Sequence, residues 1–263
     1  MTALAHDVLH AKDASPDKAM LFLHGILGRG SNWRSMARRF VRARPDWAAV
    51  LVDLRLHGDS LDAAPPHTVT ACAADLRELP LDLPLAGALG HSFGGKVALA
   101  LAQQASLHEL WLIDSMPGAR PDRHGSEAIA KVLAALRAVP ARHADRDAFV
   151  AALRAEGVAE PLGRWLAMSL KREDDGQMRY PVDLDAIDGL LDDYFALDLW
   201  GALPGANRAH VVIGEKSEVF AGPDRERVRA LAAEDPRLEV HLVEGAGHWV
   251  HVEKPSALAA LFG

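Results

Sequence analysis

A serine between glycines is the residue of this 263-residue chain best suited to chemistry. Residues 90–94 read Gly-His-Ser-Phe-Gly, with Ser92 at the centre of a G-x-S-x-G pattern. An apolar run of strand length, residues 83–89, precedes it, and residues 95–102 are rich in helix formers. Glycine permits a turn too tight for larger side chains. The pattern predicts a strand-to-helix turn that exposes the Ser92 hydroxyl at the carboxyl edge of a sheet as a nucleophile.

A serine hydroxyl needs a base within hydrogen-bond reach. Among 13 histidines, His248 is the best placed, because it lies in a glycine-rich segment just after the strand-like residues 238–243. We therefore expect it at the same sheet edge as Ser92. His251 is the rival, three residues later, and is expected on the return of the loop or at the entry to a helix.

The other histidines suggest structural roles. His24 and His91 flank glycines in tight turns, where packing or backbone hydrogen bonding is expected, and His57 is expected in a loop or at the surface. No pair of histidines has helix-face metal-ligand spacing with a carboxylate companion. The sequence therefore predicts no metal site and no cofactor.

Two segments of the sequence compete to supply the acid that orients the histidine. Asp114 closes the apolar strand-like run 110–113, where an ionisable carboxylate is costly unless it is paired. A protonated His248 imidazole would be such a partner. The alternative is Glu218 or Glu215, after a later strand. We favour Asp114, with Glu218 next.

An oxyanion hole requires two backbone N–H groups directed at the developing alkoxide. One is expected from Phe93, the residue after the nucleophile. The second is expected from the loop after the strand-like residues 19–23, where Ile26 follows a His-Gly pair.

Strand-like and helix-like segments alternate along most of the chain, which predicts an α/β fold with a largely parallel sheet covered by helices on both faces. An N-terminal hairpin is expected, with a strand at residues 7–11 and a turn near residues 15–17. From Pro117 to about Pro204 strand patterns disappear and amphipathic helical patterns replace them. We therefore predict a core of residues 1–116 and 205–263 and a helical lid of residues 117–204.

Taken together, these segments resemble the α/β-hydrolase superfamily across nearly the whole chain. The motifs are the Leu-His-Gly of residues 23–25, residues 53–60, the Gly-His-Ser-Phe-Gly-Gly-Lys of residues 90–96 and the Gly-Ala-Gly-His-Trp of residues 245–249. More narrowly, the chain resembles small bacterial acyl esterases of the YbfF type, which share the Gly-Gly-Lys, an Ile-Asp pair closing the next strand and a Gly-His-Trp-Val-His-x-Glu-Lys-Pro segment.

This resemblance implies an α/β-hydrolase fold with a mostly parallel, eight-stranded sheet. It also implies Asp114 as the acid, with Ser217 standing where an aspartate is commoner and acting as an auxiliary hydrogen-bond donor. The expected activity is hydrolysis of carboxylic esters or acyl thioesters with short to medium acyl chains. Substrate contacts are expected from the lid and the neighbouring turns, at Leu27, His91, Trp165 and Trp200.

The sequence is also compatible with two other functions. The same catalytic groups serve carbon–carbon hydrolases and lyases on this fold, whose substrates carry several carboxylates and favour arginines in the pocket. Arg29 and Arg34 are the candidates for such a cluster. A ligand receptor with slow turnover is the other alternative.

Composition and net charge limit the partners and the cellular compartment that we expect for this chain. The net charge of −7 argues against nucleic acid or an anionic membrane as a partner. The one cysteine, Cys72, excludes an internal disulfide and fits a reducing compartment. The first residues lack a signal-peptide pattern, and no apolar run approaches the roughly 20 residues that span a bilayer. We expect a cytoplasmic monomer or homodimer that acts on a small molecule.

Overall fold

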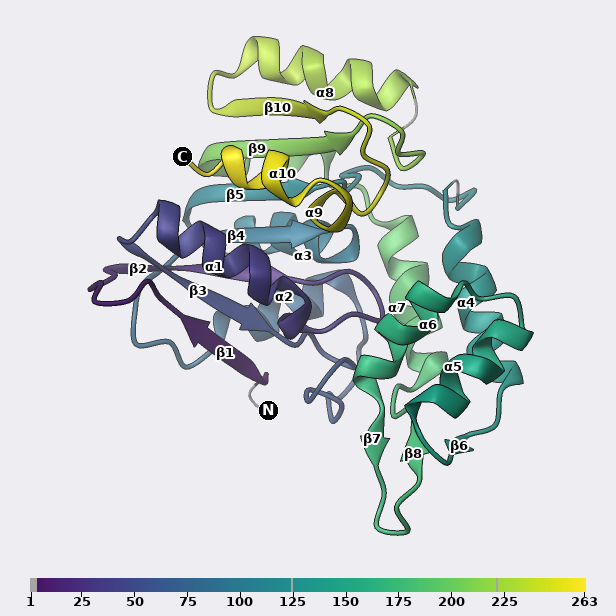
Figure 1. The fold of residues 1–263 in the computed structure, drawn as a ribbon. Helices are drawn as coiled ribbons and strands as arrows, with labels where there is room; N and C mark the ends of the chain where they lie inside the picture. The colour runs from purple at the N-terminus through teal and green to yellow at the C-terminus, as the bar shows by residue number, and fades with distance from the viewer. Residues whose placement is uncertain (1–3, 124, 221) are drawn as a thin grey trace.

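The computed structural model describes residues 4–123, 125–220 and 222–263, and its centre is a seven-stranded sheet (Figure 1). The strand order is β1-β3-β2-β4-β5-β9-β10; β1 is antiparallel to β3, and all other pairs are parallel. The strands are β1 (His6–Leu9), β2 (Lys18–Leu23), β3 (Trp47–Val52), β4 (Leu85–His91), β5 (Leu107–Ile113), β9 (Ala206–Gly214) and β10 (Leu238–Val243).

The expectation of eight strands is therefore wrong by one, and the expected N-terminal hairpin is absent from the described residues. β1 pairs with β3, while β2 lies on the other side of β3. The N-terminal segment thus supplies one antiparallel edge strand, because β1 forms its hydrogen bonds with β3 and not with β2, the strand that follows it in the sequence.

Helices cover both faces of the sheet, as the alternating pattern predicts. Met20 and Phe22 face one apolar cluster, which includes residues of α1 and α10, whereas Leu21 and Leu23 face the other, which includes residues of α2, α3 and α8. This two-residue alternation is the normal side-chain period of a strand. The covering helices are α1 (Arg34–Ala43), α2 (Val69–Arg77), α3 (Phe93–Ala102), α8 (Gly222–Glu234), α9 (Val250–Glu253) and α10 (Pro255–Ala260).

A helical insertion connects β5 to β9 and lies beyond the carboxyl ends of the parallel strands (Figure 1). It contains α4 (Glu127–Ala138), α5 (Arg146–Ala155), α6 (Glu160–Leu166) and α7 (Leu184–Ala196), with 3-10 turns η2 (Ala167–Ser169) and η3 (Trp200–Ala202); a further 3-10 turn, η1 (Gly30–Trp33), belongs to the core.

The insertion is not free of strands, contrary to the expectation from its sequence. Its β6 (Arg142–His143), β8 (Met178–Arg179) and β7 (Lys171–Arg172) form a small antiparallel sheet. The charged segment of residues 171–177 forms β7 and the turn that leads into β8. Two-residue strands are too short to show a period in the sequence.

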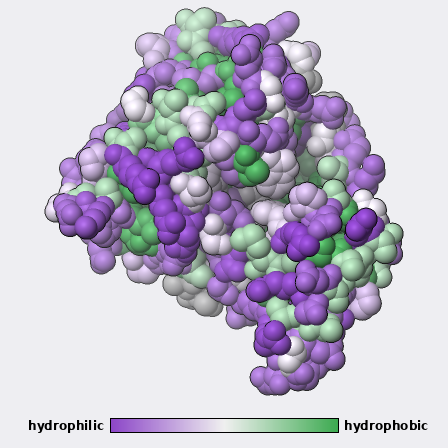
Figure 2. Space-filling view, in the orientation of Figure 1, coloured by the Kyte–Doolittle hydropathy of each residue, from purple (hydrophilic) through white to green (hydrophobic). Residues whose placement is uncertain are grey.

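Polar side chains cover most of the face drawn in Figure 2, and the surface is hollowed where the insertion meets the core. Within the described ranges, no helix combines the length and the apolar character needed to cross a membrane.

Candidate active site

Ser92 occupies the sharp turn between β4 and α3. Its φ of 52° and ψ of −118° lie outside the regions that side-chain-bearing residues favour, a conformation that costs about 1–3 kcal/mol. The glycines make the turn possible: a Cβ on Gly90 would lie 2.1 Å from the carbonyl oxygen of Gly94, and a Cβ on Gly94 would lie 2.5 Å from that of His24. The Ser92 amide donates to the carbonyl of Ile113, 3.0 Å away on the adjacent strand β5.

A fully buried carboxylate follows β5 at Asp114. Its Oδ2 lies 2.6 Å from Nδ1 of His248 and accepts a 2.5 Å hydrogen bond from Oγ of Ser217, while Oδ1 accepts from the amide of Gly214 at 3.0 Å. With Nδ1–H donating to the carboxylate, the lone pair of His248 is on Nε2, the form that a general base requires.

The residues considered as alternatives to Asp114 and His248 do not take part in this contact. Glu218 is exposed, and Glu215 accepts from the amide of Gly245 at 2.8 Å. The carboxylate that His248 contacts is that of Asp114. His251 stacks on Trp33 with ring centroids 4.4 Å apart, and burial lowers its pKa to about 3.

His91, next to the nucleophile, connects the turn to the histidine loop. Its Nε2–H donates to the backbone carbonyl of His248 at 2.9 Å, and the two rings lie 4.6 Å apart. Burial, and then the neighbouring His248, hold the pKa of His91 well below its usual value, so the ring is neutral at neutral pH. A neutral His91 positions His248 without adding a second positive charge beside it.

Two more buried histidines support the loop that carries Ile26. His57 accepts from the amide of Leu27 at Nε2, 3.0 Å away, and donates from Nδ1 to the carbonyl of Arg55 at 2.8 Å. His24 accepts from the amide of Leu54 at 3.0 Å and donates to a neighbouring carbonyl. Burial lowers the pKa of His24 to about 4 and that of His57 to about 3. His57 lies in the loop between β3 and α2, as expected, but its ring is fully buried and so the alternative, a place at the surface, is wrong.

The two residues expected to supply the oxyanion-hole amides line one cavity. Ile26 and Phe93 both line it, together with Ser92 and His248. In the part of the chain that the structure describes, neither the Ile26 nor the Phe93 amide donates a backbone hydrogen bond. Phe93 is the first residue of α3, where helix geometry leaves amides without an internal partner.

This cavity has a volume of about 140 Å³ and apolar outer walls. Leu27, His91 and Trp165, three of the four expected substrate contacts, line it. The insertion contributes residues from α4, α6 and α7, namely Ala128, Ile129, Val132, Leu162, Trp165, Leu191, Tyr194 and Phe195.

The expectation that Trp200 contacts substrate is not supported by its position, because Trp200 is not among the described residues that line the cavity. Its indole is buried in η3, with the guanidinium of Arg227 4.5 Å from its ring centre. A Cβ on Gly118 would lie 2.4 Å from its Nε1, so the ring packs against the entry to the insertion. Trp200 is thus part of the packing between the insertion and α8.

Lys96, in the Gly-Gly-Lys after the nucleophile, had no role in the sequence-based site. Its Nζ is buried in α3 and donates to the carbonyls of Gly118, Tyr194 and Leu197 at 2.8, 2.8 and 3.0 Å. Burial lowers its pKa to about 7. Lys96 therefore ties the nucleophile helix to both ends of the insertion.

Fold and site together define the class of protein. A model of the α/β hydrolase family matches residues 20–261, and the chain belongs to that family. It is 31% identical to the esterase YbfF of Escherichia coli, over 94% of this chain and 92% of that protein, which confirms the resemblance. It is 29% identical to the mouse sn-1-specific diacylglycerol lipase ABHD11, over 96% of this chain and 81% of that protein. A solved marine microorganism esterase shares the fold, with a TM-score of 0.82, 24% identity and coverage of 98% and 97% of the two chains.

Proposed function

We propose that this protein is a serine hydrolase that cleaves carboxylic esters and acyl thioesters through an acyl-enzyme intermediate. The observation that carries the proposal is the 2.6 Å contact between buried Asp114 and Nδ1 of His248, at a cavity that Ser92 also lines. The relatives named above include an esterase and a diacylglycerol lipase, and this supports ester cleavage as the reaction.

In the proposed reaction, Oγ of Ser92 attacks the acyl carbon while Nε2 of His248 accepts its proton. Asp114 stabilises the imidazolium that forms, and the amides of Ile26 and Phe93 donate to the oxyanion. Collapse of the tetrahedral intermediate breaks the bond to the leaving alcohol or thiol, which takes the proton from His248. Water then attacks the acyl-enzyme with the same base and releases the acid.

The cavity walls favour an apolar acyl group of short to medium length. Most lining residues are aliphatic or aromatic, and Arg120 is the one arginine among the described residues that line the cavity. Arg29 and Arg34, the candidates for binding a polycarboxylate, form ion pairs with Asp59 and Asp7. A carbon–carbon hydrolase or lyase acting on such a substrate is therefore the weaker proposal.

The test is turnover of p-nitrophenyl esters and acyl thioesters of two to twelve carbons by the wild type and Ser92→Ala. The wild type should turn over and be labelled by a fluorophosphonate, whereas Ser92→Ala should fold normally, escape labelling and show background hydrolysis. Ser126→Ala is the matched control, since Ser126 lines the same cavity. Turnover retained by Ser92→Ala would overturn the assignment, and wild-type protein that binds esters without turnover would favour a receptor.

A further inference from the structure

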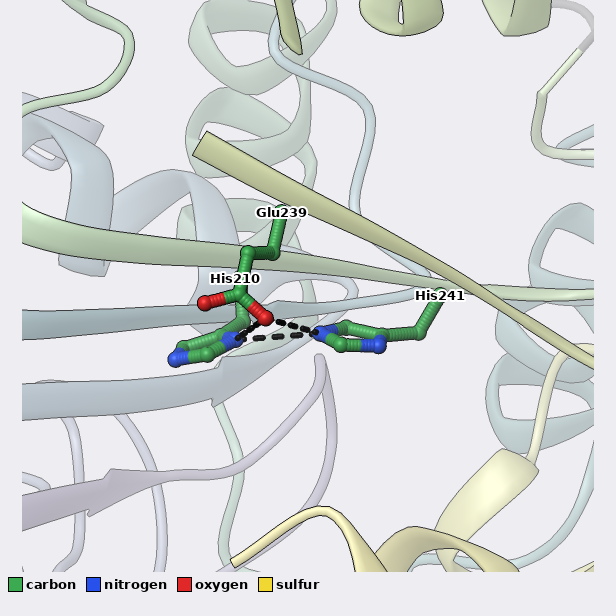
Figure 3. Close-up of side chains that lie close together, drawn as sticks. All are labelled: His210, Glu239 and His241. Atoms are coloured by element: carbon green, nitrogen blue, oxygen red, sulfur yellow. Dashed lines mark hydrogen bonds and ion pairs between the residues drawn. The ribbon is translucent and has the colours of Figure 1, made fainter. Parts of the chain in front are cut away.

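Three potential metal ligands meet on one face of the sheet, away from the candidate active site. His210 lies on β9, and Glu239 and His241 lie on the edge strand β10 (Figure 3). In the parallel register, Glu239 is the partner of His210, and His241 is two residues further along the same strand. Since alternate residues of a strand face the same side, all three side chains converge. A search for helix-face spacing cannot find ligands arranged in this way.

The donor atoms are already close to the spacing that a tetrahedral ion requires. Nδ1 of His210 lies 3.0 Å from Nε2 of His241, and Oε2 of Glu239 lies 3.9 Å from each of these nitrogens (Figure 3). Ligands about 2.0–2.1 Å from a tetrahedral zinc ion are roughly 3.3 Å apart. Side-chain adjustments of about half an ångström would therefore complete the geometry, with no change in the strands.

The surroundings direct these atoms toward a shared centre. Arg208 donates to Oε1 of Glu239 at 2.9 Å, and this contact leaves Oε2 facing the imidazoles. The Nε2 of His210 is buried without a hydrogen-bond partner, 3.9 Å from Oε1 of Glu109. A histidine that binds metal through one nitrogen commonly presents the other N–H to a carboxylate.

Two hydrogen bonds hold the Glu109 carboxylate in place, and its negative charge is balanced by a neighbouring arginine. Its Oε1 accepts from Arg44 at 2.6 Å and from the indole of Trp111 at 2.7 Å. The two carboxylates near the cluster, Glu109 and Glu239, are thus balanced by two guanidinium groups. A divalent cation would therefore enter a setting without net charge from these four side chains. For both imidazoles to bind the ion, the proton between Nδ1 of His210 and Nε2 of His241 must leave that position, and a tautomer change that places it on Nε2 of His210, which faces Glu109, frees both lone pairs.

We propose that His210, Glu239 and His241 bind one Zn²⁺ ion, with water as the fourth ligand. Two imidazoles and one carboxylate suit zinc and other late first-row metals, whereas Mg²⁺ and Ca²⁺ prefer oxygen ligands. The ion would link the edge strand β10 to β9. Because β10 leads into the loop that carries His248, this link would stabilise that part of the core.

Isothermal titration of the metal-free full chain with Zn²⁺ tests the proposal. The wild type should bind one equivalent, and Glu239→Gln and His241→Gln should each weaken binding at least about tenfold. Both positions are partly exposed, so these variants should fold, which circular dichroism checks. His108→Gln, at an exposed histidine of β5, is the matched control and should bind as the wild type. Ser92→Ala and His248→Ala should also keep the site; loss of binding in His248→Ala with retention in His241→Gln would overturn the proposal.

Co²⁺ locates the bound ion independently of affinity. Trp111 stacks on His210 with ring centroids 3.8 Å apart, so Co²⁺ in the cluster should quench its fluorescence. The chain has six tryptophans, and Trp111→Phe should abolish most of the quenching while the visible absorption of tetrahedral Co²⁺ persists. Quenching that is unchanged in Trp111→Phe would place the ion elsewhere and refute the site, as would the absence of any Zn²⁺ binding.

Discussion

The carboxyl edge of the core and the helical insertion enclose the same cavity. The polar contacts within the core edge differ in kind from those within the insertion. At the core edge, Asp114 is fully buried and contacts Ser217, Gly214 and His248 through its carboxylate. In the insertion, the polar contacts are mostly exposed ion pairs such as that of Arg164 with Glu160. Exposed pairs of this kind contribute about 0–1 kcal/mol each.

This difference indicates that the two regions have different roles in the proposed reaction. The core fixes the groups that would react by strained backbone and buried hydrogen bonds, which tolerate little movement. The insertion contributes apolar walls that can change in size without disturbing those groups. We therefore expect substitutions at the core edge to lower kcat, and those in the insertion to change which acyl chain is accepted.

The largest effect is expected at Asp114. Asp114→Asn should lower kcat about 10⁴-fold, because the amide no longer stabilises the imidazolium and favours the wrong tautomer of His248. Glu218→Gln removes the exposed alternative carboxylate and should leave kcat within about twofold. Steady-state hydrolysis of p-nitrophenyl butyrate gives both values; a larger loss in the glutamine variant would assign the acid to Glu218.

The next largest effect should come from the buried link between the two regions. Lys96→Met leaves the carbonyls of Gly118, Tyr194 and Leu197 without their donor and should lower the free energy of unfolding by about 3 kcal/mol. Lys171 links the insertion to Asp59 through a 2.7 Å ion pair, but both side chains are partly exposed. Lys171→Met should therefore cost less than about 1 kcal/mol in urea unfolding. Equal losses would mean that the exposed link matters as much as the buried one.

The core edge was also the region best predicted from sequence, because its motifs are local. The glycines around Ser92 predict the sharp turn, and a polar residue closing the apolar strand β5 predicts a buried, partnered Asp114. The partners themselves are set by tertiary structure. Ser217 follows β9 and His248 follows β10, and both reach Asp114 because β5, β9 and β10 are successive strands of the sheet.

Predictions failed where the deciding contact is distant in sequence. The predicted hairpin was wrong because a strand pattern in the sequence does not show which strand it pairs with, and β1 pairs with β3. Trp200 was assigned to the pocket as a large aromatic residue of the insertion, yet it packs beneath Arg227. The burial of His57 was missed because its ring accepts from the amide of Leu27, which lies 30 residues earlier in the sequence.

His57 provides a pH test of the core edge. Its pKa is about 3 in the folded protein against 6.5 for an unburied histidine, so the unfolded chain binds more protons between these values. Stability should therefore fall as the pH is lowered below 6.5, by about 2 kcal/mol between pH 7.5 and 5.0 from this residue alone.

Urea unfolding of wild type and His57→Gln across that range isolates the contribution, because the other buried histidines are common to both proteins. The variant should lose about 2 kcal/mol less than the wild type, and His108→Gln, at an exposed position, should follow the wild type. Parallel curves for all three proteins would show that His57 is not held neutral by burial.

The smallest effect is expected at the insertion wall and concerns substrate choice. Val132 of α4 lines the cavity, and Val132→Phe should shorten the apolar space. We expect kcat/KM for a p-nitrophenyl octanoate ester to fall about tenfold relative to the butyrate ester, the scale of a few methylene contacts in an apolar pocket. Ala130→Phe, at an exposed position of the same helix, should leave the ratio unchanged. If Val132→Phe instead lowered kcat equally for both esters, α4 would be positioning the reacting groups, and the division between a catalytic core and a selective insertion would fail.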